Sequence, residues 1–302
     1  MAYLFTHFTE TKGDQEYVWF AVSRDGLHWT DIGSDKPILA SKLGTKGIRD
    51  PFIVYDERLK KYFIIATDLL TTSGNWYNFS HKGSRSLVVW ESEDLINWSE
   101  EQLYEVGIEG AGCVWAPEAI FCKEKDAWFV FFASCVKEKG QLHHKQRIYG
   151  TFTKDFKEFT PTFKFIDAKT DVIDTNIVWD NGCYYRFSKD ETNKVIKIEK
   201  AAEILSENWE VIPCSTFDNC FGLEGPEVYY LDDMQKWCLI ADQYHEHLGY
   251  APFICDDLAA CNFTKLDADK YDLGKRKKRH GGVIKITDEQ YDKLVEAFGI
   301  DE

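Results

Sequence analysis

Four carboxylic acids and one histidine stand at the start of apolar, strand-like segments, and they recur at intervals of 50 to 68 residues. In chain order they are Asp50, Glu118, Asp174, Glu224 and His280. Hydrolysis of a glycosidic bond needs one protonated acid for the leaving oxygen and one ionised carboxylate that acts on water or on the anomeric carbon. Neighbouring carboxylates can divide these tasks, because their mutual repulsion separates their pKa values. The five residues therefore predict acid–base chemistry on a sugar, provided that the fold brings them together.

The segments around these residues belong to a repeat of three elements. Each residue opens one strand, at 50–55, 118–121, 174–179, 224–229 and 280–286. After each of the first four comes a strongly aromatic strand, at 62–66, 128–132, 184–187 and 237–241, and then a third strand that ends in an acidic turn and an aromatic residue. Such repeats are typical of folds built from one supersecondary unit. The aromatic content of 15% also favours strands, where flat side chains pack well.

The two ends of the chain each supply what the repeat lacks at the other end. The first copy begins with the aromatic strand at 3–8 and has no opening strand, whereas the last opening strand, at 280–286, has no second or third strand after it. Pairing of these two segments closes a ring of five four-stranded sheets, whose edges are short and protected. The sequence therefore predicts an all-β fold, a single five-bladed β-propeller domain over residues 1–302. Thr287 and Gln290 fit a capping box, which predicts a short terminal helix that packs through residues such as Leu294.

The propeller fold also predicts where the five opening residues lie. The innermost strands of a propeller run beside the central axis, so residues at the same end of each strand meet on one face. Four carboxylates around a narrow axis cost stability unless a function or a cation compensates for their repulsion. We therefore expect the functional site on that face, with the four acids in register.

The motifs around the opening residues are Arg49-Asp50-Pro51, Trp115-Ala116-Pro117-Glu118, Ile173-Asp174-Thr175, Glu224-Gly225-Pro226 and Arg279-His280-Gly281. In this order, and over essentially the whole chain, they resemble glycoside hydrolase family 43, the five-bladed inverting arabinofuranosidases, xylosidases and arabinanases. The resemblance implies that Asp50 is the general base, that Glu224 is the general acid, and that Asp174 orients the acid and tunes its pKa. It also implies a calcium ion on the axis near His280, often held through water, while the chemistry itself requires no cofactor. The chain departs from the family at Glu118, where many members carry Asp, and in placing a whole hairpin before the Asp50 strand.

Further side chains are predicted to contact the substrate on the same face. The candidates are Arg49, Asp68, Trp115, Glu118 and Arg186. Asp68 and Arg186 lie on or at the end of aromatic strands, where a charge is otherwise costly. Trp115 is either an apolar wall for a sugar ring or a core residue. The insertion 69–86, which contains Trp76, either rims the pocket or is a plain surface loop.

The resemblance implies an exo-acting, inverting α-L-arabinofuranosidase that releases terminal arabinose from hemicellulose-derived oligosaccharides, with β-xylosidase side activity. A β-xylosidase is one alternative. A retaining fructan hydrolase is another, because a related propeller also uses Arg-Asp-Pro, but no Asn-Asp-Pro-Asn stands near the start of this sequence. A non-catalytic carbohydrate-binding propeller would keep the aromatic residues but would not need three aligned acids.

Charge and patterning argue against other classes of function. The formal net charge of −15 would repel a phosphate backbone, so nucleic acid is not an expected partner. No apolar run approaches the ~20 residues of a membrane span, and no basic segment with a cleavage site opens the sequence, so we expect a cytoplasmic protein with no membrane partner. The nine cysteines form no Cys-x-x-Cys pair, so we expect free thiols. The basic run 275–279 is interpreted as a solvated loop.

Overall fold

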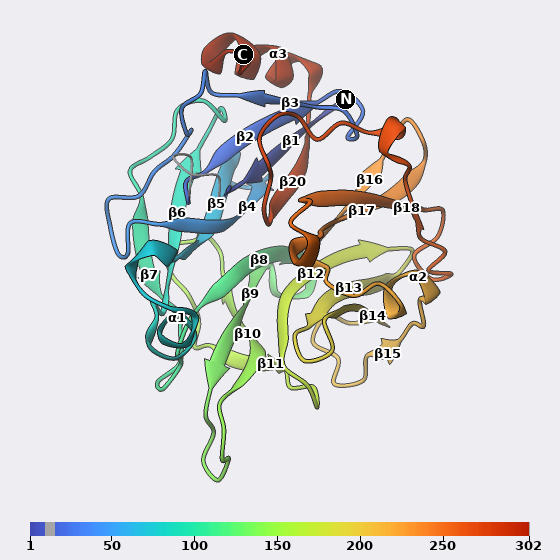
Figure 1. The fold of residues 1–302 in the computed structure, drawn as a ribbon. Coiled ribbons are helices and arrows are strands. Elements are labelled where there is room, and N and C mark those ends of the chain that lie inside the picture. Colours follow the sequence, from blue (N-terminus) through green and yellow to red (C-terminus); the bar gives the residue numbers. More distant parts are fainter. Residues whose placement is uncertain (10–15, 302) are drawn as a thin grey trace.

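The computed structural model describes residues 1–9 and 16–301, which form a ring of five antiparallel sheets, or blades, of four strands each (Figure 1). The first blade contains, from the axis outwards, β20 (Gly281–Ile286), β1 (Ala2–His7), β2 (Trp19–Ser23) and β3 (Trp29–Ile32). The second contains β4 (Ile48–Asp56), β5 (Lys61–Asp68), β6 (Ser86–Ser92) and β7 (Gln102–Glu105). The third contains β8 (Trp115–Cys122), β9 (Ala127–Val136), β10 (Lys145–Thr153) and β11 (Phe163–Ile166). The fourth contains β12 (Val172–Asp180), β13 (Cys183–Asp190), β14 (Val195–Ala201) and β15 (Glu210–Val211), and the fifth contains β16 (Glu224–Leu231), β17 (Lys236–Asp242), β18 (Tyr250–Cys255) and β19 (Thr264–Lys265).

The ring closes as the two chain ends predict. β20 pairs antiparallel with β1, from Ala2 opposite Ile286 to His7 opposite Gly281. The last strand of the chain is thus the innermost strand of the first blade. This pairing confirms the five-bladed propeller and leaves β1 without an open edge.

In the part of the chain that the structure describes, three short α-helices lie outside the five sheets. They are α1 (Trp76–Lys82), α2 (Ser215–Asp218) and α3 (Asp288–Phe298). The capping box of Thr287 and Gln290 starts α3, and Leu294 is buried against the first and second blades, as predicted. No helix among the described residues is long and apolar enough to cross a membrane.

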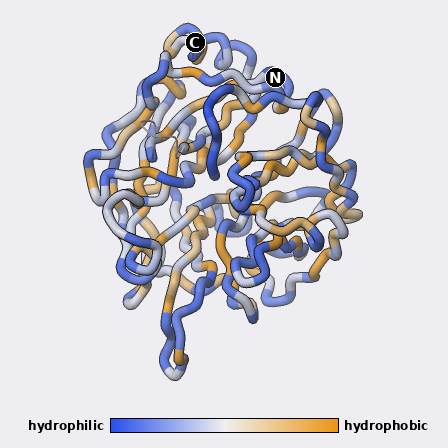
Figure 2. Tube along the Cα trace, in the orientation of Figure 1, coloured by the Kyte–Doolittle hydropathy of each residue, from blue (hydrophilic) through white to orange (hydrophobic). Residues whose placement is uncertain are grey.

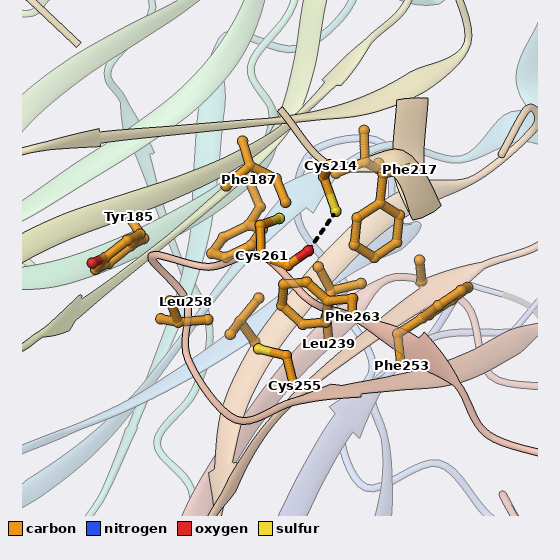
Figure 3. Close-up of a cluster of buried hydrophobic side chains, with 14 of the residues drawn as sticks. Tyr185, Phe187, Cys214, Phe217, Leu239, Phe253, Cys255, Leu258, Cys261 and Phe263 are labelled. Carbon is orange, nitrogen blue, oxygen red and sulfur yellow. Dashed lines mark hydrogen bonds between the residues drawn. The ribbon is translucent and has the colours of Figure 1, made fainter. Parts of the chain in front are cut away.

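Packing between neighbouring blades builds the core. Apolar residues follow the strands, whereas the loops are mainly hydrophilic (Figure 2). Figure 3 shows the cluster between the fourth and fifth blades, where Phe187, Phe217 and Phe253 are fully or almost fully buried. Burying one such side chain stabilises the fold by roughly 1.5–3 kcal/mol, so these aromatic contacts make a rigid frame for the axial residues.

Part of the basic run 275–279 belongs to this frame, so its interpretation as a solvated loop holds for the exposed Lys275 and Lys277 but is wrong for the rest. Lys278 is 2% exposed, and its Nζ lies 2.6 Å from Asp31 Oδ1. Arg276 binds Asp301 and lies over the ring of Trp19, 3.7 Å from its centroid. The run leads into the innermost strand of the first blade, and buried carboxylates balance the charges of Arg276 and Lys278.

Candidate active site

Three of the predicted acids line one small cavity at the end of the propeller axis. Strands β4, β12 and β16 supply Asp50, Asp174 and Glu224. The cavity has a volume of about 100 Å³, and its other lining residues are Phe8, Arg49, Leu69, Trp76, Trp115, Ile173, Arg279 and His280. Pockets for drug-sized ligands measure ~300–1,000 Å³, so this one suits a single sugar unit.

The inner strands turn their acids into the cavity through local bulges. Asp50 and Asp174 have φ values of 50° and 47°, and each lies at a register shift between its strand and the next. Ala116 and Gly225 occupy the corresponding positions in β8 and β16, with φ values of 45° and 55°. The expectation that the four acids share one register is therefore wrong. A left-handed conformation of this kind costs a non-glycine residue about 1–3 kcal/mol, a strain that is common at functional sites.

Glu118 lies one layer deeper than the cavity. It follows Ala116 by two residues, and Asn176 and Glu227 hold the matching places in their strands. Asn176 Nδ2 donates to Glu118 Oε2 at 2.8 Å and to Glu227 Oε2 at 2.7 Å. Burial raises the pKa of Glu118 to about 7, and burial also raises the pKa of Glu227 well above its usual range. Glu118 therefore contacts Asn176 and His280 beneath the cavity and does not line it, contrary to the prediction that it contacts the substrate.

Asp50 is held as an ionised carboxylate. Thr67 Oγ1 donates to its Oδ2 at 2.8 Å, and Thr67 Oγ1 itself accepts the backbone N–H of Ala116 at 2.8 Å. Burial alone would raise the pKa of Asp50, but His280, Arg49 and Thr67 outweigh that effect and lower it. The group has the charge that a general base needs at neutral pH.

His280 lies between two of the acids. Its Nδ1 lies 3.4 Å from Asp50 Oδ1, and its Nε2 lies 3.5 Å from Glu118 Oε1. Burial would lower the pKa of His280, but the proximity of these two carboxylates and of Asp174 raises it well above its usual range. Both ring nitrogens face acids, and in the described part of the chain no three His, Cys, Asp or Glu side chains are grouped to hold a metal ion. The ring does not fit direct coordination of calcium, and an ion held through water stays a prediction for metal analysis to test.

The sequence suggested a raised pKa for the general acid Glu224, but the structure raises the pKa of Asp174 instead. Glu224 accepts Lys189 Nζ at 2.7 Å and Arg279 at 2.8 Å. Burial would raise its pKa, but these two cations and Arg49 lower it. Asp174 Oδ2 accepts the backbone N–H of Gly225 at 3.1 Å, and burial raises its pKa to about 6. The acid with the raised pKa is therefore Asp174, and not Glu224.

Two of the predicted substrate contacts reach the cavity. Arg49 lines it with its guanidinium 4.3 Å from the centroid of the Phe8 ring and its Nη1 3.3 Å from Glu16. Trp115 is a wall residue, edge-on to Trp76 with ring centroids 6.1 Å apart. Trp76, on the insertion between β5 and β6, is thus at the rim of the pocket.

The other two charged candidates lie elsewhere. Asp68 accepts the backbone N–H and the hydroxyl of Thr45, both at 2.7 Å, and so anchors the loop before β4. Arg186 donates to Glu199 at 2.7 Å, and its guanidinium lies 4.2 Å from the centroid of the Trp209 ring. Asp68 is bound by a neighbouring loop and Arg186 by the next strand of its blade, and neither lines the cavity.

Sequence reasoning missed Lys189 and gave no role to Arg279. Lys189 is 2% exposed, and its Nζ also lies 2.7 Å from Glu191 Oε2. Arg279 joins Glu224 to the buried Asp242. A signal for Lys189 was present, since it is a charged residue at the end of an aromatic strand, the same rule that selected Asp68.

A larger hollow does not compete as a catalytic site. It has a volume of about 660 Å³ and is lined at the outer edge of the third blade by residues that include Phe152, Phe159 and Asp155. Asp155 accepts the backbone N–H groups of Lys157 and Glu158, so it caps a turn. Of the two, only the axial cavity brings together carboxyl groups from three inner strands, and acid–base hydrolysis requires at least two carboxyl groups around the bond.

Known proteins similar to this chain include several carbohydrate-active ones. The profile of a family described as "Probable glycosyl hydrolase domain", related to glycoside hydrolase family 43, matches residues 1–292. An α-L-arabinofuranosidase of Bifidobacterium longum subsp. longum is 28% identical in a 228-residue alignment that covers 67% of this chain and 21% of that protein, so the chain spans about a fifth of the length of this curated relative. A solved endo-1,4-β-xylanase from Bacteroides thetaiotaomicron has a TM-score of 0.59 at 14% identity, over 84% of this chain and 85% of that one. The catalytic domain of the GH62 α-L-arabinofuranosidase from Coprinopsis cinerea has a TM-score of 0.53 at 15% identity, over 80% and 73% of the two chains, and at such identities the likeness shows the fold.

Proposed function

This chain belongs to the glycosyl hydrolase domains related to glycoside hydrolase family 43, and from that membership we propose that it is an inverting, exo-acting α-L-arabinofuranosidase. One observation supports the proposal above all. Asp50, Asp174 and Glu224 line a cavity of only about 100 Å³, formed where the inner strands of three blades begin. A terminal sugar fits such a site, whereas the middle of a chain would need room on both sides.

The proposed mechanism gives each acid one task. Asp50 removes a proton from a water molecule as the water oxygen bonds to the anomeric carbon. Glu224 gives its proton to the leaving oxygen as the glycosidic bond breaks. Asp174 holds the backbone N–H of Gly225 and so fixes the strand that carries Glu224. Water attacks the face opposite the leaving group, and the anomeric configuration inverts.

The protonation of Glu224 limits this reaction at higher pH. Because Lys189 and Arg279 lower its pKa, the proton needed for the leaving group is lost as the pH rises. Asp50 stays ionised across the neutral range, because its own pKa is lowered too. The rate on substrates with poor leaving groups is therefore expected to fall from mildly acidic toward neutral pH.

Replacing Lys189 with methionine should move this fall to higher pH. Removing a cation makes the carboxylate form of Glu224 less favourable, which raises its pKa, so the acid keeps its proton to higher pH. The measurement is kcat/KM against pH on an oligosaccharide, with Lys200→Met as the matched control, because Lys200 pairs with Glu210 away from the cavity. A profile that stays in place, or that moves to lower pH, in a folded Lys189→Met protein would contradict this electrostatic account.

The sugar is proposed from the relatives. The Bifidobacterium longum relative and the Coprinopsis cinerea structure are described as α-L-arabinofuranosidases, and a β-xylosidase side activity fits the likeness to the xylanase fold. The expected substrates are arabinose-substituted oligosaccharides derived from hemicellulose. A panel of nitrophenyl glycosides tests this, and we expect the α-L-arabinofuranoside to be hydrolysed fastest. Faster turnover of a xyloside or galactoside would reassign the sugar, and tight binding of sugars without any turnover would favour a binding module.

A further inference from the structure

Trp76 both lines the catalytic cavity and faces solvent. It begins α1, in the insertion between β5 and β6, and its side chain is among those that enclose the acids. Even so, 58% of the residue is exposed. A residue that meets both conditions stands at the mouth of the cavity, where a ligand that extends beyond the first sugar must pass.

The indole ring is held by its surroundings. Trp115 and Phe79 meet it edge-on, with centroids 6.1 and 5.8 Å away and interplanar angles of 89° and 88°. Arg49 also lies over the ring, with its Cζ 5.6 Å from the centroid, and the exposed fraction of Trp76 is the part of the ring that these three neighbours leave open to a ligand. The orientation is therefore set before any ligand binds, which reduces the entropy lost on binding.

The helix that carries Trp76 is itself fastened to the strand that carries Trp115. The backbone N–H of Gly83 donates to Gly112 at 2.7 Å, and Val114 donates to Ser84 at 3.0 Å. A Cβ at Gly112 would lie 2.2 Å from the carbonyl oxygen of Ser80, so only glycine permits this close approach. Trp76 and Trp115 thus belong to one supported wall.

We propose that Trp76 is the aromatic platform for the sugar unit on the leaving side of the bond, and so determines specificity for an oligosaccharide over a simple glycoside. The inference rests on the proposed function of the cavity. The cavity holds one sugar, with the acids around it, so the next unit lies at the mouth, against the exposed indole face. An aromatic face packs against the apolar C–H face of a neutral pyranose, and a large rigid ring gives contact area at low cost in side-chain freedom.

Another tryptophan offers a matched control. Trp179, in β12, is 54% exposed, close to the exposure of Trp76, but it does not line the cavity. Single exposed aromatic residues are normal on protein surfaces, so exposure alone does not mark a platform. The pair separates the effect of position from the effect of removing an indole.

The test compares two substrates that share the terminal sugar. One is an arabinose-substituted xylo-oligosaccharide and the other is α-L-arabinofuranosyl fluoride, whose leaving group has no ring. Trp76→Ala is expected to lower kcat/KM on the oligosaccharide about tenfold, mainly through KM, and to change the fluoride less than twofold. Trp76→Phe should lower kcat/KM on the oligosaccharide by a smaller factor than Trp76→Ala does. Trp179→Ala should leave kcat/KM unchanged on both substrates.

A binding measurement keeps the proposal testable if the hydrolysis proposal fails. Calorimetry with an unsubstituted xylo-oligosaccharide measures the affinity of the leaving-side subsite alone, because this ligand carries no arabinose. Trp76→Ala should weaken this binding about tenfold whether or not turnover occurs. Equal losses on the oligosaccharide and the fluoride would overturn the proposal, because the ring would then serve the first sugar or the fold. An unchanged rate on the oligosaccharide, or unchanged or undetectable binding of the xylo-oligosaccharide, would overturn it as well.

Discussion

Replacing Asp50 with alanine is expected to lower kcat by about 10³–10⁴-fold on every substrate, whatever its leaving group. The reason is that the water must lose a proton in the step that forms the new bond, and this demand does not depend on how easily the other bond breaks. Asp50 is placed for that task by Thr67 and His280, and its pKa is lowered so that it is ionised at neutral pH. Azide should partly restore the rate, because it attacks without giving up a proton and fits the space that the carboxylate leaves.

The control for Asp50 is Asp68→Asn. Asp68 is also a buried acid of the second blade, but it holds Thr45 and lies outside the cavity, and an asparagine oxygen can accept the same bonds. The kcat of this variant should stay within a few-fold of the wild-type value. If Asp50→Ala keeps more than a tenth of the activity, Asp50 is not the base. An azide product of retained configuration requires two displacements and so a nucleophile that is still present, which would instead make Asp50 the acid–base group of a retaining mechanism.

Replacing Glu224 with alanine should separate substrates by leaving group. On oligosaccharides, whose leaving oxygen needs a proton, the rate should fall about 10²–10⁴-fold. On dinitrophenyl glycosides, whose leaving group departs as an anion, it should fall less than tenfold. Glu191→Gln is the matched control, because both carboxylates bind Lys189 but Glu191 does not line the cavity.

The comparison with Asp174→Ala decides between the two acids. Asp174 has the raised pKa, to about 6, while the pKa of Glu224 is lowered by its cations. If Glu224 is the acid, Asp174→Ala should slow both substrate classes by shifting the strand that Asp174 holds through Gly225. If only Asp174→Ala discriminates between leaving groups, the two residues exchange roles.

The fold was predictable because its signals are local and repeated. The opening strands, the aromatic strands and the complementary chain ends each appear in the sequence as short patterns, and the pairing of β20 with β1 follows from them. The cavity acids were predictable for the same reason, since Asp50, Asp174 and Glu224 all stand at the same end of an inner strand. The capping box before α3 is likewise read directly from Thr287 and Gln290.

The depth of each acid was not predictable, because a bulge adds one residue and so shifts every later side chain, and its position is not marked in these mostly buried strands. Ala116, rather than Glu118, occupies the bulge position in β8, so Glu118 sits below the cavity. Ion-pair partners were hidden too. The buried Lys278 is bound by Asp31 from the other end of the chain, and the pairing of Arg186 with Glu199 depends on the register of β13 with β14.

The stereochemistry of hydrolysis tests the central claim most directly. Proton NMR during hydrolysis of an α-L-arabinofuranoside at high enzyme concentration identifies the anomer that is released first. We predict that the β-anomer appears first and that the α-anomer follows only by mutarotation, because water attacks from the Asp50 side while Glu224 protonates the leaving oxygen. Initial release of the α-anomer would contradict an inverting mechanism with Asp50 as base and Glu224 as acid.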